Sequence, residues 1–120
     1  MRKRIGDASG LLPLMPAEFQ ILLALADADR HGYGIMMEVR DRTGGRVVLG
    51  PGTLYGTIKR LLERGLILET AEETDPSLGE ERRRYYRLSD LGRELAAAEA
   101  RRMAHLIEDA EAKALIPKGT

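Results

Sequence analysis

The chain has 120 residues, of which 43% are hydrophobic and none is cysteine, and its 19 basic residues balance 19 acidic ones. This length allows one domain, or one domain with an appendage, and the lack of cysteine excludes disulfides and thiolate metal sites. No apolar run approaches the roughly 20 residues of a membrane span, and the apolar stretch before Pro16 is too short for a secretory signal. We therefore expect a soluble, cytoplasmic protein without a membrane segment.

The net charge of zero conceals a segregation of charge along the sequence. Residues 30–64 carry seven Lys or Arg against three Asp or Glu, residues 66–81 carry six acids and no base, and residues 82–88 carry four arginines and no acid. Binding to nucleic acid depends on a local basic face rather than on total charge. The neutral total therefore does not exclude a nucleic-acid partner.

The first segment, residues 1–14, contains Gly6, Gly10 and Pro13 and shows no hydrophobic period, so we predict a flexible N-terminal arm. A helix is predicted next, from Pro16 to Ala28. It is apolar on most of its circumference, which is typical of a helix buried on more than one face. We expect one face to pack within its own domain and another to contact a partner chain.

A second helix is predicted after a turn at residues 29–32. It runs from about Tyr33 to Thr43, and Gly44-Gly45 terminates it because glycine favours the end of a helix. Residues 46–49 then form a short β-branched piece.

The third helix is predicted from about Pro51 to Arg64. Proline is tolerated in a first helical turn, and Gly65 is well placed as the residue that follows the last turn. Apolar residues that lie within about 100° of one another make its core face. These residues are Leu54, Ile58, Leu61 and Leu62.

A β-hairpin and a long helix complete the predicted elements. The strands span Leu66–Glu73 and Arg82–Leu88, and residues 74–79 between them have a typical turn composition. The last helix begins after Ser89, a predicted N-cap, and its apolar stripe reaches about Leu115, which makes it about 39 Å long. The stripe residues that we expect in a dimer interface are Leu95, Met103, Leu106, Ile107 and Ala110.

This order of elements is that of a winged helix-turn-helix, a mainly α fold with a small β-hairpin. We predict the DNA-binding domain at residues 15–88 and the dimerisation helix at residues 89–116. In this fold the third helix enters the major groove of DNA. The candidate DNA contacts on it are Thr53, Thr57, Lys59, Arg60 and Arg64, with Tyr55 at the border between core and DNA.

A glycine lies near the middle of the predicted DNA-facing side of the third helix. In a helix interior, Gly56 costs up to about 1 kcal/mol of stability relative to alanine. One interpretation is that it lets the backbone approach DNA closely, and the other is that it is merely tolerated. The sequence leaves both interpretations open.

Three consecutive arginines open the second strand of the hairpin: Arg82, Arg83 and Arg84. They suit the neutralisation of phosphates in or near a minor groove. The alternative is a solvated edge paired with Glu72, Glu73, Glu80 and Glu81, but the position after a basic third helix favours DNA. Because alternate residues of a strand share a face, one of Tyr85 and Tyr86 points to the core.

Three separate motifs resemble the PadR family of transcriptional regulators. They are Gly52-Thr53-Leu54-Tyr55 together with residues 58–67, His31-Gly32-Tyr33 upstream, and residues 83–92 downstream. They occur in the right order and spacing over residues 16 to about 95. The resemblance implies a winged-helix domain that binds double-stranded DNA, a homodimer built through the C-terminal helix, and usually repression relieved by a small molecule.

The sequence departs from the family pattern at two places that bear on DNA binding. Gly56-Thr57 stands where Pro-Ala is common, so we expect the recognised DNA sequence to be unusual. The predicted wing tip is longer and acidic at Glu80-Glu81, where the family commonly has glycine followed by basic residues. Whether the tip contacts DNA is therefore open.

The sequence also bears on two other classes of function, an enzyme and a protein-interaction module. For an enzyme, His31 and His105 are isolated in different segments, and no HExxH sequence or nucleophile elbow occurs, so we predict no catalytic residue, no metal and no cofactor. A winged helix used only as a protein-interaction module is disfavoured, though not excluded, by the basic third helix. No aromatic residue follows Tyr86, so the sequence gives no basis for a ligand site that stacks aromatic compounds at the long helix. A ligand pocket of Met, Leu and Ala between the first and last helices stays open, but we favour a dimer core for these residues.

Overall fold

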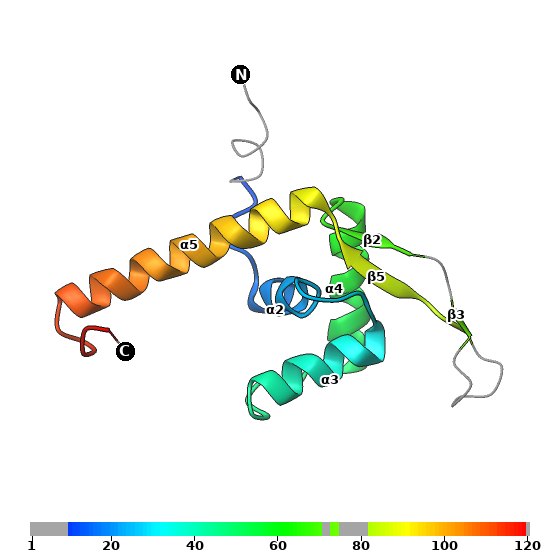
Figure 1. Cartoon of the computed structure of the whole chain (residues 1–120), viewed down its shortest axis with the longest axis horizontal. Helices are drawn as coiled ribbons and strands as arrows, with labels where there is room; N and C mark the ends of the chain where they lie inside the picture. The colour runs from blue at the N-terminus through cyan, green and yellow to red at the C-terminus, as the bar shows by residue number, and fades with distance from the viewer. Residues whose placement is uncertain (1–9, 71–72, 75–81, 120) are drawn as a thin grey trace, which may run out of the picture.

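The computed structural model describes residues 10–70, 73–74 and 82–119, and this part of the chain is mainly helical with a small sheet (Figure 1). The helices are α2 (Pro16–Ala24), α3 (Gly32–Arg42), α4 (Pro51–Glu63) and α5 (Asp90–Ala112). The strands are β1 (Arg30–His31), β2 (Ile67–Glu69), β3 (Glu73–Thr74), β4 (Arg82–Arg83) and β5 (Tyr85–Leu88). The second half of α5 extends away from the other helices (Figure 1). None of the described helices is long and apolar enough to cross a bilayer.

The start of α5 and the end of α4 follow the local signals in the sequence. The Ser89 Oγ accepts a hydrogen bond from the Gly92 backbone N–H at 2.9 Å, as predicted for an N-cap. The same hydroxyl donates to the Gly65 carbonyl at 2.7 Å and so joins the two helices. Gly65 has a φ of 75°, the left-handed conformation that favours glycine after a helix.

Two helices end earlier than the sequence predicts. The predicted end of α2 at Ala28 is wrong, since the helix ends at Ala24, whose carbonyl accepts a hydrogen bond from Arg30 Nε at 2.7 Å. The end of α5 is Ala112, and Ala114 just beyond it has a φ of 63°. Apolar residues continue past both ends, so the hydrophobic pattern overestimates the length of these helices.

The main sheet has three antiparallel strands in the order β1-β5-β2. Arg30 of β1 is paired with Tyr86, and Ile67 of β2 with Leu88. The short strands β3 and β4 pair with each other and extend the predicted hairpin, whose turn at residues 75–81 lies outside the described residues. The predicted turn at residues 29–32 is wrong at Arg30–His31, because these two residues form β1. A two-residue strand is too short to show the alternating pattern by which a strand is predicted.

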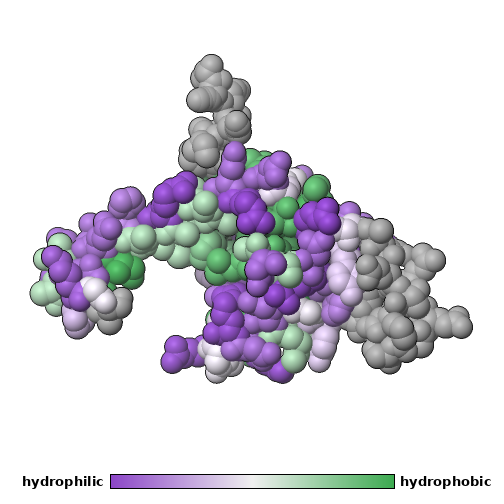
Figure 2. Space-filling view, in the orientation of Figure 1, coloured by the Kyte–Doolittle hydropathy of each residue, from purple (hydrophilic) through white to green (hydrophobic). Residues whose placement is uncertain are grey.

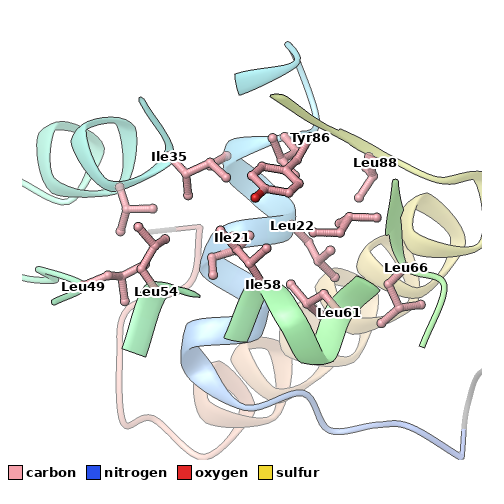
Figure 3. Close-up of a cluster of buried hydrophobic side chains, with 14 of the residues drawn as sticks. Ile21, Leu22, Ile35, Leu49, Leu54, Ile58, Leu61, Leu66, Tyr86 and Leu88 are labelled. Carbon is pink, nitrogen blue, oxygen red and sulfur yellow. The ribbon is translucent and has the colours of Figure 1, made fainter. Parts of the chain in front are cut away.

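The core lies where α2, α3, α4 and the sheet meet (Figure 3). Ile21, Leu22, Ile35 and Leu61 are all 0% exposed. Leu95 of α5 belongs to the same core and is also 0% exposed. Its predicted place in a dimer interface is therefore wrong, because its own domain already covers it.

The start of α5 packs closely on the domain, and the segment before α2 is part of the same core. A Cβ on Gly92 would collide with the backbone oxygen of Leu66, so only glycine allows this close approach. Leu14, which the sequence places in a flexible arm, is 7% exposed and packs in the core. The arm boundary is corrected accordingly, and residues 1–9 of the predicted arm lie outside the described residues.

Candidate nucleic-acid interface

The solvent side of α4 carries polar and basic residues opposite its buried apolar face. Leu54 and Leu61 are 1% and 0% exposed, whereas Thr53, Lys59 and Arg60 are exposed. The helix begins at Gly50-Pro51, where the N-cap residue has no side chain to occupy the first N–H groups. The solvent side of α4 therefore offers the Thr53 hydroxyl and the cations of Lys59 and Arg60 to a large partner, and the start of the helix offers backbone N–H groups that no side chain caps.

The prediction that Thr57 lies on the DNA-facing side of α4 is wrong. It is 1% exposed, and its Oγ1 accepts a hydrogen bond from Arg60 Nη2 at 3.2 Å. At about 100° per residue, Thr57 lies only about 60° from Leu54 and 40° from Leu61, at the edge of the core stripe. Its hydroxyl made it look like a surface residue, but its structural role is to hold the guanidinium of Arg60.

Tyr55 lies at the border between the domain core and the exposed side of α4. It is 51% exposed, and its ring rests against the backbone of Gly32 at the start of α3. A Cβ on Gly32 would collide with the Tyr55 ring, so the glycine makes room for the tyrosine. The Gly32–Tyr55 contact therefore ties the position of α4 to the start of α3.

His31 stabilises this end of α3 as its N-cap. Its Nδ1 accepts a hydrogen bond from the Gly34 backbone N–H at 2.9 Å. Its ring also contacts Tyr85 of β5 edge-on, with 5.2 Å between ring centroids. These two contacts give His31 a structural role between α3 and the sheet. Within the described residues, no cluster of His, Asp or Glu could hold a metal ion.

Arg64 is bound within the chain rather than directed away from it. Its Nη1 donates to Glu18 Oε2 at 2.8 Å, and Glu18 is 2% exposed. The other carboxylate oxygen of Glu18 accepts from the Met15 backbone N–H at 2.8 Å. The sequence reasoning missed Glu18, although an acid three residues after a helix cap is a known signal.

Two arginines of the hairpin, Arg84 and Arg87, lie beside acids. Arg84 Nη1 is 3.3 Å from Glu69 Oε2, and Arg87 makes hydrogen bonds of 2.9 and 3.1 Å to Asp29, which raise the pKa of its guanidinium. Arg82 and Arg83 form β4, but their side chains lie outside the described part of the chain. At Arg84 the structure therefore has the alternative arrangement, a solvated strand edge on which an arginine pairs with an acid. The acid is Glu69 and not one of the glutamates of residues 72–81.

The two neighbouring tyrosines of β5 point to opposite sides, as alternation predicts. Tyr86 is 6% exposed, and Tyr85 is partly exposed. Burial, and then the nearby Glu69 carboxylate, raise the pKa of the Tyr86 hydroxyl. Tyr86 is therefore a neutral core residue, whereas the ring of Tyr85 contacts His31 on the other side of the strand.

The distal half of α5 presents apolar side chains to solvent. Met103, Leu106 and Ile107 are 37%, 52% and 48% exposed, and Ala110 is partly buried. Green and pale green residues are visible along the lower side of α5 in Figure 2. Apolar side chains at this spacing on one helix favour contact with a partner surface.

These observations define a winged helix-turn-helix protein with a projecting C-terminal helix. The chain matches the Transcriptional regulator PadR-like family over residues 21–98 and belongs to this family. The members of the family are transcriptional regulators and not enzymes.

Two curated relatives share substantial sequence with this chain. It is 39% identical over 90 residues to an uncharacterised 37.1 kDa protein in a transposon of Streptomyces fradiae. It is 36% identical over 73 residues to an uncharacterised protein X of Lysinibacillus sphaericus. The matches cover 75% and 61% of this chain, but 24% and 64% of the two relatives, so the chain spans only part of their length.

Solved structures agree with the fold. A PadR family transcription regulator from Clostridium difficile is 27% identical with a TM-score of 0.66, over 83% of this chain and 98% of that one. A transcriptional regulator from Clostridium thermocellum is 24% identical with a TM-score of 0.66, over 90% and 96% of the two chains. Bacillus subtilis PadR, solved in complex with operator DNA, is 20% identical with a TM-score of 0.60, over 68% and 45%.

Proposed function

We propose that this chain is a sequence-specific DNA-binding regulator that acts as a homodimer and represses transcription. The observation that best supports the proposal is the solvent side of α4, where Thr53, Lys59 and Arg60 are exposed on the helix that enters the major groove in this fold. Membership of the PadR-like family supports a role in transcription. The solved complex of Bacillus subtilis PadR with operator DNA is consistent with this partner.

Each α4 residue has a role that fits its chemistry. Arg60 is suited to guanine, whose O6 and N7 accept two hydrogen bonds from a guanidinium. The Thr57 hydroxyl limits the freedom of that guanidinium. Thr53 and Lys59 suit phosphates, which position a protein on the duplex without reading its sequence. Arg64 is 39% exposed and remains a proposed phosphate contact although one of its nitrogens binds Glu18, and the wing arginines remain proposed phosphate contacts as well.

The proposed homodimer forms through the distal half of α5. A second copy of the chain would cover Met103, Leu106 and Ile107, whose burial removes apolar surface from water. A two-fold axis would place the two α4 helices about 34 Å apart, one turn of DNA. The operator would then be a pseudo-palindrome of double-stranded DNA.

Relief of repression by a small molecule completes the proposal. The resemblance to the family supports such an inducer, and the proposal includes no cofactor. The inducer must bind a DNA-incompetent state of the dimer more tightly than the DNA-bound state, since only differential affinity shifts an equilibrium. A compound that raises the operator Kd without dissociating the dimer would meet this condition.

The test is a fluorescence anisotropy titration of the full chain with genomic fragments at several salt concentrations. We expect log K to fall linearly with log salt, with a slope that reports the number of neutralised phosphates. Lys59→Ala should reduce that slope by about one unit. Lys118→Ala, which removes an exposed charge beyond α5, is the matched control and should leave the slope unchanged.

Two results would contradict the proposal. No affinity for any fragment at low salt would exclude DNA as the partner and favour the protein-interaction alternative. Equal affinity for all fragments would exclude sequence-specific regulation, even if the salt dependence is steep.

A further inference from the structure

Glu99 is the last buried residue of α5. It is 0% exposed, whereas the described residues after it in the helix are exposed or only partly buried. It therefore marks the point at which α5 leaves the domain. A carboxylate at such a position is costly unless its charge and its lone pairs are satisfied.

Both oxygens of Glu99 have partners. Arg102, one turn further along α5, donates from Nε to Oε1 at 2.7 Å and from Nη2 to Oε2 at 3.0 Å. The backbone N–H of Leu14 donates to Oε2 at 3.1 Å. These donors lower the pKa of the Glu99 carboxyl, although burial opposes them. Glu99 is thus an ionised group that joins α5 to the segment before α2.

The next residue of that segment is held in the same way. The Met15 backbone N–H donates to the buried Glu18 of α2, and Glu18 also binds Arg64 at the end of α4. Two consecutive backbone N–H groups are therefore bound by two buried carboxylates. The contacts form a continuous connection from α5 through Leu14 and Met15 to α2 and α4.

Among the described residues, the other attachments of α5 to the domain lie near the start of the helix. Ser89 bonds to Gly65, Gly92 packs on the Leu66 backbone, and Leu95 enters the core. Glu99 lies about 10 Å beyond Gly92 along the helix axis, at about 1.5 Å per residue. Contacts at the start of a helix fix the position of that end. A further contact along the helix, such as that of Glu99, fixes the direction of its axis.

We propose that Glu99 is a positioning residue that sets the direction of α5 relative to the domain and thereby the separation of the two α4 helices in the dimer. The inference rests on the proposed homodimer and adds the residue that determines its geometry. Because the separation of the α4 helices must match the spacing of two half-sites, Glu99 would restrict which operator spacings the dimer accepts.

The test measures the distance between the two α4 helices directly. The chain has no cysteine, so Lys59→Cys gives one labelling site for a nitroxide on the exposed side of α4. Pulsed electron paramagnetic resonance on the dimer then gives the distribution of distances between the two labels. The parent should give one narrow distribution centred near 34 Å, plus the reach of the labels.

Two substitutions at Glu99 are compared in this background. Glu99→Leu removes the acceptor for Leu14 and should broaden or shift the distribution. Glu99→Gln keeps an acceptor but loses the charge that binds Arg102, and should give an intermediate result that remains informative if the leucine variant does not fold. Ile35→Val is the control: it lowers stability from a fully buried site in α3 and should leave the distribution unchanged.

The outcomes separate this inference from the proposed function. Unchanged distributions in folded, dimeric Glu99 variants overturn the positioning role and leave the homodimer intact. Equal broadening by Ile35→Val also overturns it, because general loosening of the fold would then suffice. A parent chain that is monomeric by light scattering overturns the homodimer itself, and the positioning role with it. Broadening confined to the Glu99 variants supports the role.

Discussion

The two halves of α5 have different surroundings although a single apolar stripe runs along both. In the first half, Leu95 and Glu99 are fully buried by the chain's own domain. In the second half, Met103, Leu106 and Ile107 keep 37–52% of their surface exposed. A helical period shows that a face requires cover, but it does not show which surface supplies the cover. The stripe therefore serves two partners in succession: the domain, and then the proposed second copy.

The largest expected difference between the two halves is in stability. Leu95→Ala should lower the free energy of unfolding by about 2–5 kcal/mol, because it leaves a cavity in the core. Leu106→Ala should change the unfolding of the isolated monomer by less than about 0.5 kcal/mol, as expected for an exposed site. Urea unfolding at several protein concentrations separates the two effects, since only the dimer's stability depends on concentration. Equal losses in the free energy of unfolding from Leu95→Ala and Leu106→Ala at every protein concentration would contradict the comparison.

A charge in the distal half should divide the dimer and leave the domain folded. We expect Leu106→Glu to be monomeric by light scattering, with an unchanged far-UV circular dichroism spectrum. Loss of the linkage between two half-site contacts should weaken operator binding by about a hundredfold or more. Glu108→Gln, which changes an exposed charge on the same half, is the control. A dimer that survives Leu106→Glu would exclude this interface.

A change on α4 should weaken DNA binding without affecting the dimer. Arg60→Ala should cost about 1–3 kcal/mol of specific binding if its guanidinium reads a base. Thr57→Val removes the acceptor for that guanidinium and should cause a smaller loss in the same direction. The measurement compares the cognate operator with random DNA in anisotropy titrations. An equal loss on both would show that Arg60 contacts phosphate.

Local signals were sufficient for much of the fold. The Ser89 cap, the Gly65 turn and the alternation of Tyr85 and Tyr86 are properties of a few neighbouring residues, and the structure has all three. The order of three helices, a hairpin and a long helix follows from such signals in succession. β1 did not follow, because its two residues become a strand only by pairing with β5.

The errors at the candidate site have a different origin. Thr57 sits at the edge of the core stripe, where a small residue can face either side, and Leu95 is covered by elements that a helical period cannot identify. Glu18 has a local signal as the third residue of its helix, but the sequence shows neither its burial nor that of Glu99. Their burial depends on partners brought together by the fold, such as Arg64, which lies 46 residues from Glu18.

Acidification should weaken the attachment of the buried half of α5 to the domain. Arg102 and then the Leu14 N–H hold the pKa of Glu99 below its ordinary value of 4.5, although burial opposes them. A carboxyl with a lowered pKa stabilises the fold above its unfolded pKa, and this contribution is lost as the pH falls through the folded value. Unfolding from neutral pH to below 4.5 should therefore show a steeper loss for the parent than for Glu99→Gln. Parallel profiles would show that Glu99 contributes little.

The smallest expected effect is that of Gly56→Ala, a substitution in α4 that does not alter α5. It distinguishes the two interpretations of this glycine. Among the described residues, a Cβ there would meet only Arg60 Nη1, at 3.9 Å, so Gly56→Ala should raise stability by up to about 1 kcal/mol. If the glycine lets the backbone approach DNA, operator affinity should fall while stability rises. Unchanged affinity would show that the glycine is merely tolerated. Gly65→Ala is a contrasting control, since its positive φ predicts a loss of stability where Gly56→Ala predicts a gain.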